Sequence, residues 1–150
     1  MKSQMLLIAL LVLMATLSHA YRLGFRSTTY RPSSFRLNAD MVECMQGDFD
    51  KNVIQPSMTA PVIVDFYADW CGPCKIVAPI FKKLAEDITT VNFVKVDTDV
   101  HDEMADKYGI QGLPLFALFI KGEVVAKHSG ALTKDNLKKF IESNIEKAQV

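Results

Sequence analysis

The residues best suited to chemistry are two cysteines at positions 71 and 74, with Gly72 and Pro73 between them. Two cysteines at this spacing can close a small disulfide loop, and the proline stands where it would open a helix at its first position. The positive end of a helix stabilises a thiolate. The sequence therefore predicts a redox-active pair. Cys71 lies at the exposed helix end and attacks, while Cys74, one turn inside, is shielded and resolves.

Half of a zinc site is the alternative interpretation of the two cysteines. Zinc usually takes four ligands from paired clusters. Beyond the pair the chain offers only Cys44 and three histidines, none of them at ligand spacing. The sequence therefore favours redox chemistry and predicts no metal. Cys44 is expected to be a buried and inert thiol, with a regulatory thiol as the alternative.

The cysteine pair lies between a predicted buried strand and a predicted helix. Val62–Tyr67 is a run of β-branched and aromatic residues, which is typical of a buried strand. An apolar stripe at helical spacing follows Pro73. Pro79 inside this helix is expected to kink it, because proline removes a backbone donor and clashes with the preceding turn. The stripe comprises Val77, Ile80, Phe81, Leu84 and Ile88.

The rest of the chain after residue 39 continues the alternation of strands and helices. Gly109 ends one helix, Lys121 and Gly122 join two strands into a hairpin, and Thr133 is a suitable N-cap for a final helix. This order predicts an α/β domain around a central mixed sheet. The further predicted elements are strands over Ala39–Cys44, Asn92–Asp97, Leu115–Ile120 and Glu123–Ser129, and helices over Asp48–Ile54 and Asp102–Tyr108.

The composition is that of one globular domain preceded by a segment of different character. The chain has 150 residues, of which 49% are apolar, and its 17 basic residues balance its 17 acidic ones. The apolar fraction excludes a disordered chain, and three cysteines are too few for a disulfide scaffold. The lack of a basic surplus argues against nucleic-acid binding. Residues 1–38 carry five basic and no acidic side chains, so residues 39–150 are acidic.

Residues 1–20 are typical of a signal peptide. Lys2 precedes an apolar run over Met5–Leu17 that is too short to span a membrane, which takes about 20 residues. Ser18 and Ala20 put small residues at the −3 and −1 positions of a cleavage site after Ala20. A short membrane anchor or a core helix is the alternative.

Residues 21–38 are typical of an organellar transit peptide, because they are rich in arginine and serine and contain no acid. A signal peptide followed by such a segment resembles the two-part presequence of algae with secondary plastids, and the aromatic Tyr21 after the cleavage site fits that pattern. We therefore expect import into the plastid stroma through the endomembrane system, with residues 39–150 as the mature domain. A secreted or lumenal protein with a basic linker is the alternative.

The run from Asp65 to Lys75, which contains the cysteine pair, is followed in order by Ala78-Pro79, Lys95–Asp97, Lys107–Ile110, Gly112–Pro114 and Gly130–Leu132. Through these segments residues 39–150 resemble thioredoxins. Positions 62–150 match the family over nearly its whole length, and positions 39–61 are compatible with its first strand and helix. The resemblance implies the thioredoxin fold, an α/β architecture with a central mixed sheet flanked by helices on both faces.

The resemblance implies a protein-disulfide reductase that acts by dithiol–disulfide exchange, without a bound cofactor. Gly72 and Pro73 match the reducing thioredoxins, whereas oxidase and isomerase relatives usually carry a histidine between the cysteines. Disulfide-containing proteins are the expected targets, and the electrons come from a reductase protein, ferredoxin-dependent in a plastid and NADPH-dependent elsewhere. We expect a monomer without stable membrane association after processing. A secretory-pathway oxidase or isomerase and a thioredoxin-fold binding subunit are the alternatives.

The resemblance also assigns roles to an acid and a lysine. It makes Asp65 a buried general base near Cys74, and burial should raise the pKa of this carboxyl. Lys95, in the next strand, is expected to lie near Asp65 and to tune it. A structural acid hydrogen-bonded to the backbone and an exposed edge-strand lysine are the respective alternatives.

A client-docking surface is implied around the cysteines. Pro114 matches a cis-proline that brings the backbone of Leu113 beside Cys71, where an extended client segment could pair as an added strand. Leu115 departs from the threonine that is usual after this proline, and we expect it to make the docking face more apolar. The predicted surface comprises Trp70, Gly72, Pro73, Leu113, Gly130 and Ala131.

Overall fold

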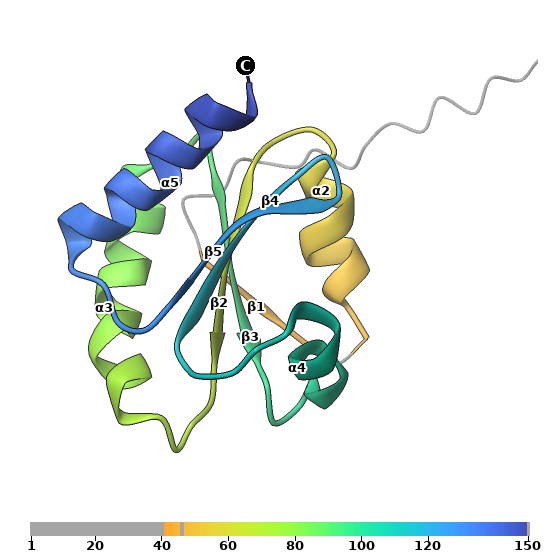
Figure 1. Cartoon of the computed structure of the whole chain (residues 1–150), viewed down its shortest axis with the longest axis vertical. Coiled ribbons are helices and arrows are strands. Elements are labelled where there is room, and N and C mark those ends of the chain that lie inside the picture. Colours follow the sequence, from red (N-terminus) through yellow and green to blue (C-terminus); the bar gives the residue numbers. More distant parts are fainter. Residues whose placement is uncertain (1–40, 46, 150) are drawn as a thin grey trace, which may run out of the picture. The chain divides into compact units, whose positions relative to one another are not determined.

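A five-stranded mixed sheet forms the centre of the domain (Figure 1), with the strand order β1-β3-β2-β4-β5. The computed structural model describes residues 41–45 and 47–149, so the predicted signal peptide and transit segment lie outside the described residues. β1 and β2 both run parallel to β3, while β4 is antiparallel to β2 and β5. The strands are β1 (Val42–Cys44), β2 (Val62–Tyr67), β3 (Asn92–Asp97), β4 (Leu115–Ile120) and β5 (Glu123–Ser129).

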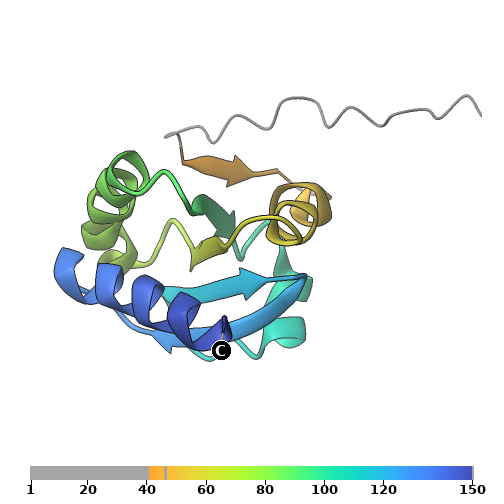
Figure 2. The ribbon, with the colours of Figure 1, turned by 90° about the horizontal axis from the view of Figure 1, so that it is seen from above.

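Helices cover both faces of this sheet. Figure 2 shows α3 (Gly72–Asp87) and α5 (Lys134–Ala148) on one side of the sheet. The short helices η1 (Asp50–Ile54) and α2 (Gln55–Ser57) lie on the other side, as does α4 (Asp102–Tyr108). The arrangement confirms the predicted α/β architecture.

Alternation along the inner strands divides the core into two layers. Side chains that point to opposite faces follow one another along a strand, and the apolar residues of β2, β3 and β4 follow this rule. All six residues of β2 are buried, because this strand is central and covered on both faces. The layer under α3 and α5 contains Ile63, Phe93, Phe116, Leu118, Phe81, Leu84 and Leu137. The opposite layer contains Val64, Phe66, Val94, Val96, Phe119, Phe49 and Met104.

Most element boundaries agree with the sequence-based prediction, and the differences lie near prolines and the chain start. The first strand begins at Val42, and the first helical segment continues through α2 to Ser57 instead of stopping at Ile54. Pro56 is the second residue of α2, which directly follows the π-helical segment η1. α3 begins one residue before Pro73 and continues through Pro79 to Asp87.

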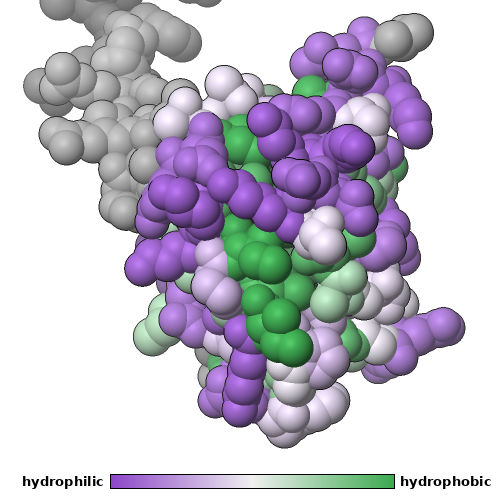
Figure 3. Space-filling view, turned by 90° about the vertical axis from the view of Figure 1, so that its left-hand side faces the viewer, coloured by the Kyte–Doolittle hydropathy of each residue, from purple (hydrophilic) through white to green (hydrophobic). Residues whose placement is uncertain are grey.

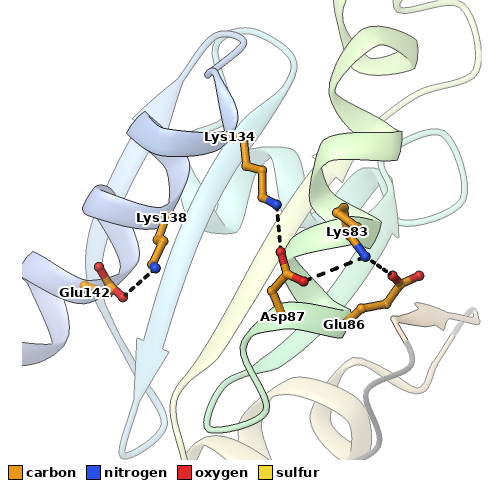
Figure 4. A network of polar contacts seen from close by, with 6 residues as sticks. All are labelled: Lys83, Glu86, Asp87, Lys134, Lys138 and Glu142. Carbon is orange, nitrogen blue, oxygen red and sulfur yellow. Dashed lines mark hydrogen bonds and ion pairs between the residues drawn. The ribbon is translucent and has the colours of Figure 1, made fainter.

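Charged side chains join the outer surfaces of α3 and α5 (Figure 4). Lys134 Nζ lies 2.7 Å from Asp87 Oδ2, and this hydrogen bond lowers the pKa of the Asp87 carboxyl. Lys83 Nζ lies 2.9 Å from Glu86 and 3.8 Å from Asp87. These groups are solvent-exposed, and exposed pairs contribute little free energy. The packing of α3 and α5 therefore rests mainly on their apolar faces. Figure 3 shows an apolar band between hydrophilic residues on the side of the domain that carries these two helices.

Candidate active site

Cys71 and Cys74 are joined by a disulfide at the start of α3. Cys71 is the N-cap of the helix, with an extended backbone, and its Sγ accepts a hydrogen bond from the Cys74 amide at 3.2 Å. An amide donor and the positive helix end both favour negative charge on this sulfur when the disulfide is reduced. The structure thus confirms that the pair lies at a helix N-terminus.

The predicted difference in exposure between the two cysteines is wrong. Each residue is only 4% exposed, because both pack in one small cluster with Tyr67 and Leu113. Exposure therefore does not separate an attacking cysteine from a resolving one. The two differ instead in hydrogen bonding, since the backbone amide of Cys74 points at the sulfur of Cys71.

The loop before β4 lies against the disulfide. The Leu113–Pro114 peptide bond is cis, as the sequence predicted, and Leu113 contacts the cysteine cluster. The Gly130 amide donates to the Pro114 carbonyl at 2.8 Å and joins this loop to the end of β5. The sequence segments around positions 71, 113 and 130 are thereby brought to one end of the sheet.

Leu115 does not make the docking face more apolar, contrary to the expectation from the sequence. It is 4% exposed and packs in the core layer that contains Val96 and Phe119, and the next residue, Phe116, is fully buried in the other layer. Strand β4 is covered on both faces, so both side chains are directed into the interior.

Trp70 is the largest exposed apolar side chain beside the disulfide. It is 72% exposed, and its Nε1 donates to Asp99 Oδ1 at 3.2 Å. Gly72 and Pro73 are also exposed between the two buried cysteines, and Ala131 is exposed beyond β5. Ile76, which the sequence interpretation did not single out, is 69% exposed on the next turn of α3.

Asp65 is fully buried in the middle of β2. Among the residues that the structure describes, neither of its carboxylate oxygens has a hydrogen-bond partner. The predicted alternative of an acid hydrogen-bonded to the backbone is therefore wrong. Burial raises the pKa of Asp65 to about 7, and the positive charge of Lys95 opposes this rise.

Lys95 lies on the inner strand β3, directly opposite Asp65 in the parallel register with β2. Its side chain is half-buried, so it is not the exposed edge-strand lysine of the alternative interpretation. The Lys95 Nζ lies 3.6 Å from the centroid of the Tyr67 ring. Lys95 and Cys74 also line one small pocket of about 80 Å³, which is wide enough to admit water.

A model of the thioredoxin family matches residues 40–143 of this sequence. The chain belongs to the thioredoxin family. It is 34% identical to a thioredoxin of Pseudomonas aeruginosa over 110 residues, which cover 73% of this chain and all of the relative. It is 40% identical to the chloroplastic thioredoxin Y2 of Arabidopsis thaliana over 90 residues, which cover 59% of this chain and 54% of that protein.

Solved thioredoxin structures share the fold. Thioredoxin f from spinach chloroplast, in its short form, aligns with a TM-score of 0.66 at 30% identity, covering 73% of this chain and 96% of that one. A point mutant of a thioredoxin from Halobacterium salinarum aligns with a TM-score of 0.62 at 36% identity, covering 71% of this chain and 91% of that one. The predicted thioredoxin fold is confirmed.

Family membership establishes the reaction. Thioredoxins are protein-disulfide oxidoreductases, and the Cys71–Cys74 disulfide is placed at a helix start as such a reaction requires. The chain therefore reduces disulfides of target proteins by dithiol–disulfide exchange. A reductase protein returns it to the dithiol state. Both conclusions agree with the sequence-based prediction.

Cys44 and His101 are not part of the cluster that contains the disulfide. Cys44 is buried, as predicted, and burial raises the pKa of its thiol, so it is a poor nucleophile near neutral pH. His101 is also buried, and its Nε2 lies 3.3 Å from the Cys44 carbonyl oxygen. Within residues 41–45 and 47–149 no three potential ligands are grouped as a metal site. Over the same residues no helix is long and apolar enough to cross a membrane.

Sequence reasoning missed the contacts of three residues around the site. Asp99 accepts a hydrogen bond from the Trp70 indole, and Glu43 accepts one from the Tyr67 hydroxyl. The Tyr67 ring lies against the Lys95 ammonium. The two hydrogen-bonded pairs are 29 and 24 positions apart along the chain, and the third contact joins adjacent strands. A single sequence carries no local signal for such contacts, because they depend on strand register and loop placement.

Proposed function

We propose that Cys71 is the attacking cysteine of this thioredoxin and Cys74 the resolving one. The observation that carries the assignment is the hydrogen bond from the Cys74 amide to Cys71 Sγ at 3.2 Å. This donor, together with the helix N-terminus, lowers the energy of a thiolate on Cys71. An equivalent donor to Cys74 would have to come from deeper in α3, where the amides bond to carbonyls of the helix itself.

The reaction proceeds in two exchanges with balanced electrons. The Cys71 thiolate attacks one sulfur of a target disulfide, forms a mixed disulfide and releases the other target sulfur as a thiolate. Cys74 then loses its proton and attacks Cys71 Sγ. This step forms the Cys71–Cys74 disulfide and releases the second target sulfur. The target gains two electrons, and the cysteine pair is oxidised.

Asp65 is the base that we propose for the second exchange. It is buried and unpaired among the described residues. Such burial costs free energy, and groups in this state are common at functional sites. A pKa of about 7 leaves it able to accept a proton at neutral pH and to release it afterwards. Lys95 limits the rise in this pKa through its positive charge, and in this sense it tunes the base.

An extended client segment docks, in this proposal, beside Leu113 and pairs with its backbone as an added strand. The support is the contact of Leu113 with the cysteine cluster and the exposure of Trp70, Gly72 and Pro73 around it. Gly130 and Ala131 complete the surface, since the Gly130 amide is bonded to the loop at Pro114. Trp70 and Ile76 are the large apolar side chains exposed nearby, which suits transient docking by a monomer.

We also propose that the protein works in the plastid stroma, that residues 1–38 carry it there through the endomembrane system, and that a ferredoxin-dependent reductase supplies its electrons. The support is the composition of residues 1–38 together with similarity to chloroplastic thioredoxins Y of Arabidopsis thaliana and of rice. A fluorescent reporter fused to residues 1–40 tests the address.

Turnover of an insulin-type disulfide with dithiothreitol as electron source tests the chemical assignment. Cys71→Ser should abolish reduction and should form no covalent complex with the target. Cys74→Ser should also stop turnover but should retain the first exchange. Normal turnover by Cys74→Ser would overturn the assigned roles.

A further inference from the structure

The Lys95 ammonium is held by an aromatic ring instead of by a carboxylate. Its Nζ lies 3.6 Å from the centroid of the Tyr67 ring, well inside the range of a cation–π interaction. Within the part of the chain that the structure describes, no carboxylate oxygen lies within 4.0 Å of this ammonium. Lys95 borders a small pocket, so water could compete for its charge. Among the described residues, the Tyr67 ring is thus the group that holds the Lys95 ammonium in position.

Two carboxylates stand on either side of Lys95 on the same face of the sheet. In the parallel register Lys95 is opposite Asp65 of β2 and opposite Glu43 of β1. Tyr67, two residues after Asp65, projects to this same face. The hydroxyl of Tyr67 donates to Glu43 Oε1, so the Tyr67 side chain reaches from β2 across β3 to β1.

We propose that Tyr67 is a positioning residue that keeps the Lys95 ammonium available to Asp65. The Tyr67 ring binds the ammonium. Its hydroxyl donates a hydrogen bond to Glu43, the carboxylate that would otherwise compete with Asp65 for this ammonium. The inference rests on the proposed role of Asp65 as a base. It adds that the pKa of this base depends on a tyrosine that packs against the two cysteines but forms no bond in the exchange.

The other charged groups near this cluster come from three elements. Asp97 follows Lys95 on β3 and is opposite Tyr67, while Asp69 follows β2. The negative charges of both carboxylates raise the pKa of the Tyr67 hydroxyl. Lys75 and Cys74 of α3 line the pocket beside Lys95. β4 contributes the uncharged Phe116 opposite Asp65. Burial and the bond to Glu43 raise the pKa of Tyr67, so its hydroxyl remains a donor while Asp65 titrates.

The first test removes only the hydroxyl. In the full chain with the Cys71–Cys74 disulfide intact, the pKa of Asp65 is measured from the ¹³C shift of its carboxyl carbon. Tyr67→Phe keeps the ring but frees Glu43 to draw the ammonium away, so the Asp65 pKa should rise by roughly half a pH unit. Glu43→Gln added to Tyr67→Phe removes the competitor and should return the pKa to near its original value.

The second test weakens the attraction of the ring for the ammonium with little change in ring size. In the Glu43→Gln background, position 67 carries phenylalanine with zero, one, two or three fluorine atoms. Each fluorine reduces the negative charge of the ring face, so the Asp65 pKa should rise stepwise along the series. A purely structural role of the ring predicts no such trend. Lys95→Met is the reference that shows the full effect of losing the ammonium.

The outcomes separate this inference from the proposed function. If Lys95→Met raises the Asp65 pKa while Tyr67→Phe and the fluorine series leave it unchanged, Tyr67 does not position Lys95 and the inference is overturned. If Lys95→Met itself has no effect, both the tuning role of Lys95 and this inference are wrong. The titration needs no turnover. It therefore decides the role of Tyr67 even if Asp65→Asn reduces targets at the normal rate.

Discussion

Asp65 and Lys95 lie directly opposite each other on adjacent parallel strands, in the layer beneath the helix that begins at the disulfide. The carboxylate is fully buried and, within the described residues, accepts no hydrogen bond, while the ammonium rests on the ring of Tyr67. Burial raises the pKa of Asp65 to about 7 against the opposing charge of Lys95, so both protonation states of the carboxyl are accessible near neutral pH. The register of β2 and β3 therefore places the charge that opposes the rise in the Asp65 pKa.

Replacing this carboxylate should stabilise the protein in a pH-dependent way. The pKa of Asp65 in the folded chain is raised to about 7, above the ordinary aspartate value of 3.8, so ionisation favours unfolding. The wild-type chain should therefore lose stability as the pH rises from about 4 to about 7, by at most ~4 kcal/mol. Asp65→Asn should lack this loss.

Urea unfolding of both proteins at several pH values measures the difference. The stability advantage of Asp65→Asn should be small at pH 4, should grow up to about pH 7 and should then stay constant. An advantage that does not vary with pH would mean that Asp65 is not protonated at neutral pH in the folded chain.

The same substitution should slow the second exchange. A base with a pKa of about 7 makes release of the client faster as the pH rises through 7. Asp65→Asn should reduce the release rate by roughly 100-fold at pH 7 and should remove this inflection. Rapid-quench measurement of the mixed disulfide over pH 5.5–9 checks both effects. An unchanged pH–rate profile would remove Asp65 from the mechanism.

Much of this arrangement could be predicted from the sequence, because it depends on local patterns. Val62–Tyr67 was predicted with its observed bounds, since six consecutive β-branched, acidic and aromatic residues between breakers fit only a covered strand. Gly109 was predicted as a helix end, and its positive φ of 62° explains why glycine stands there. The Cys71–Cys74 pair is equally local, because both residues lie within one helical turn.

Features that depend on tertiary packing could not be predicted in this way. Leu115 was placed on the docking face because it follows Pro114, but the covering of β4 on both faces turns it into the core. The equal burial of the two cysteines arises from Tyr67 and Leu113, which come from other segments. The bond between Tyr67 and Glu43 depends on the register of three strands, which no short pattern encodes.

Trp70 should contribute to client binding without contributing to stability. It is 72% exposed, so Trp70→Ala removes little buried area, yet it deletes the largest apolar group beside the disulfide. The KM for a protein disulfide should rise roughly 5- to 30-fold, as expected for the loss of an anchoring tryptophan. Reduction of a small aromatic disulfide should be nearly unaffected.

Val125→Ala is the matched control for this experiment, because Val125 is an exposed apolar residue on the edge strand β5. It should leave the KM for both substrates unchanged. Equal effects of the two substitutions on protein clients would show that general surface hydrophobicity is responsible, and the docking surface around Trp70 would be wrong.

The first 38 residues should direct the protein without affecting its chemistry. Deleting residues 1–20 should prevent translocation into the endomembrane system, since Met5–Leu17 is the apolar run that a translocation channel would recognise. Deleting residues 21–38 should divert the protein along the secretory path. Microscopy of reporter fusions in an alga with secondary plastids, together with insulin reduction by each purified variant, measures both effects.

Two results would contradict this address. One is secretion of the intact reporter fusion into the culture medium. The other is a protein purified from cells whose amino terminus is Met1. A change in reduction rate when residues 1–38 are removed would show, in addition, that they take part in the active domain.

The most direct test of the central claim is the intact mass of Cys74→Ser after incubation with a disulfide-containing target. If Cys71 attacks and Cys74 resolves, this variant should accumulate a covalent adduct whose mass equals the sum of the two proteins, and dithiothreitol should release it. Cys71→Ser should form no adduct under the same conditions. Adduct formation by Cys71→Ser, with none by Cys74→Ser, would contradict the account, because it would make Cys74 the attacking residue.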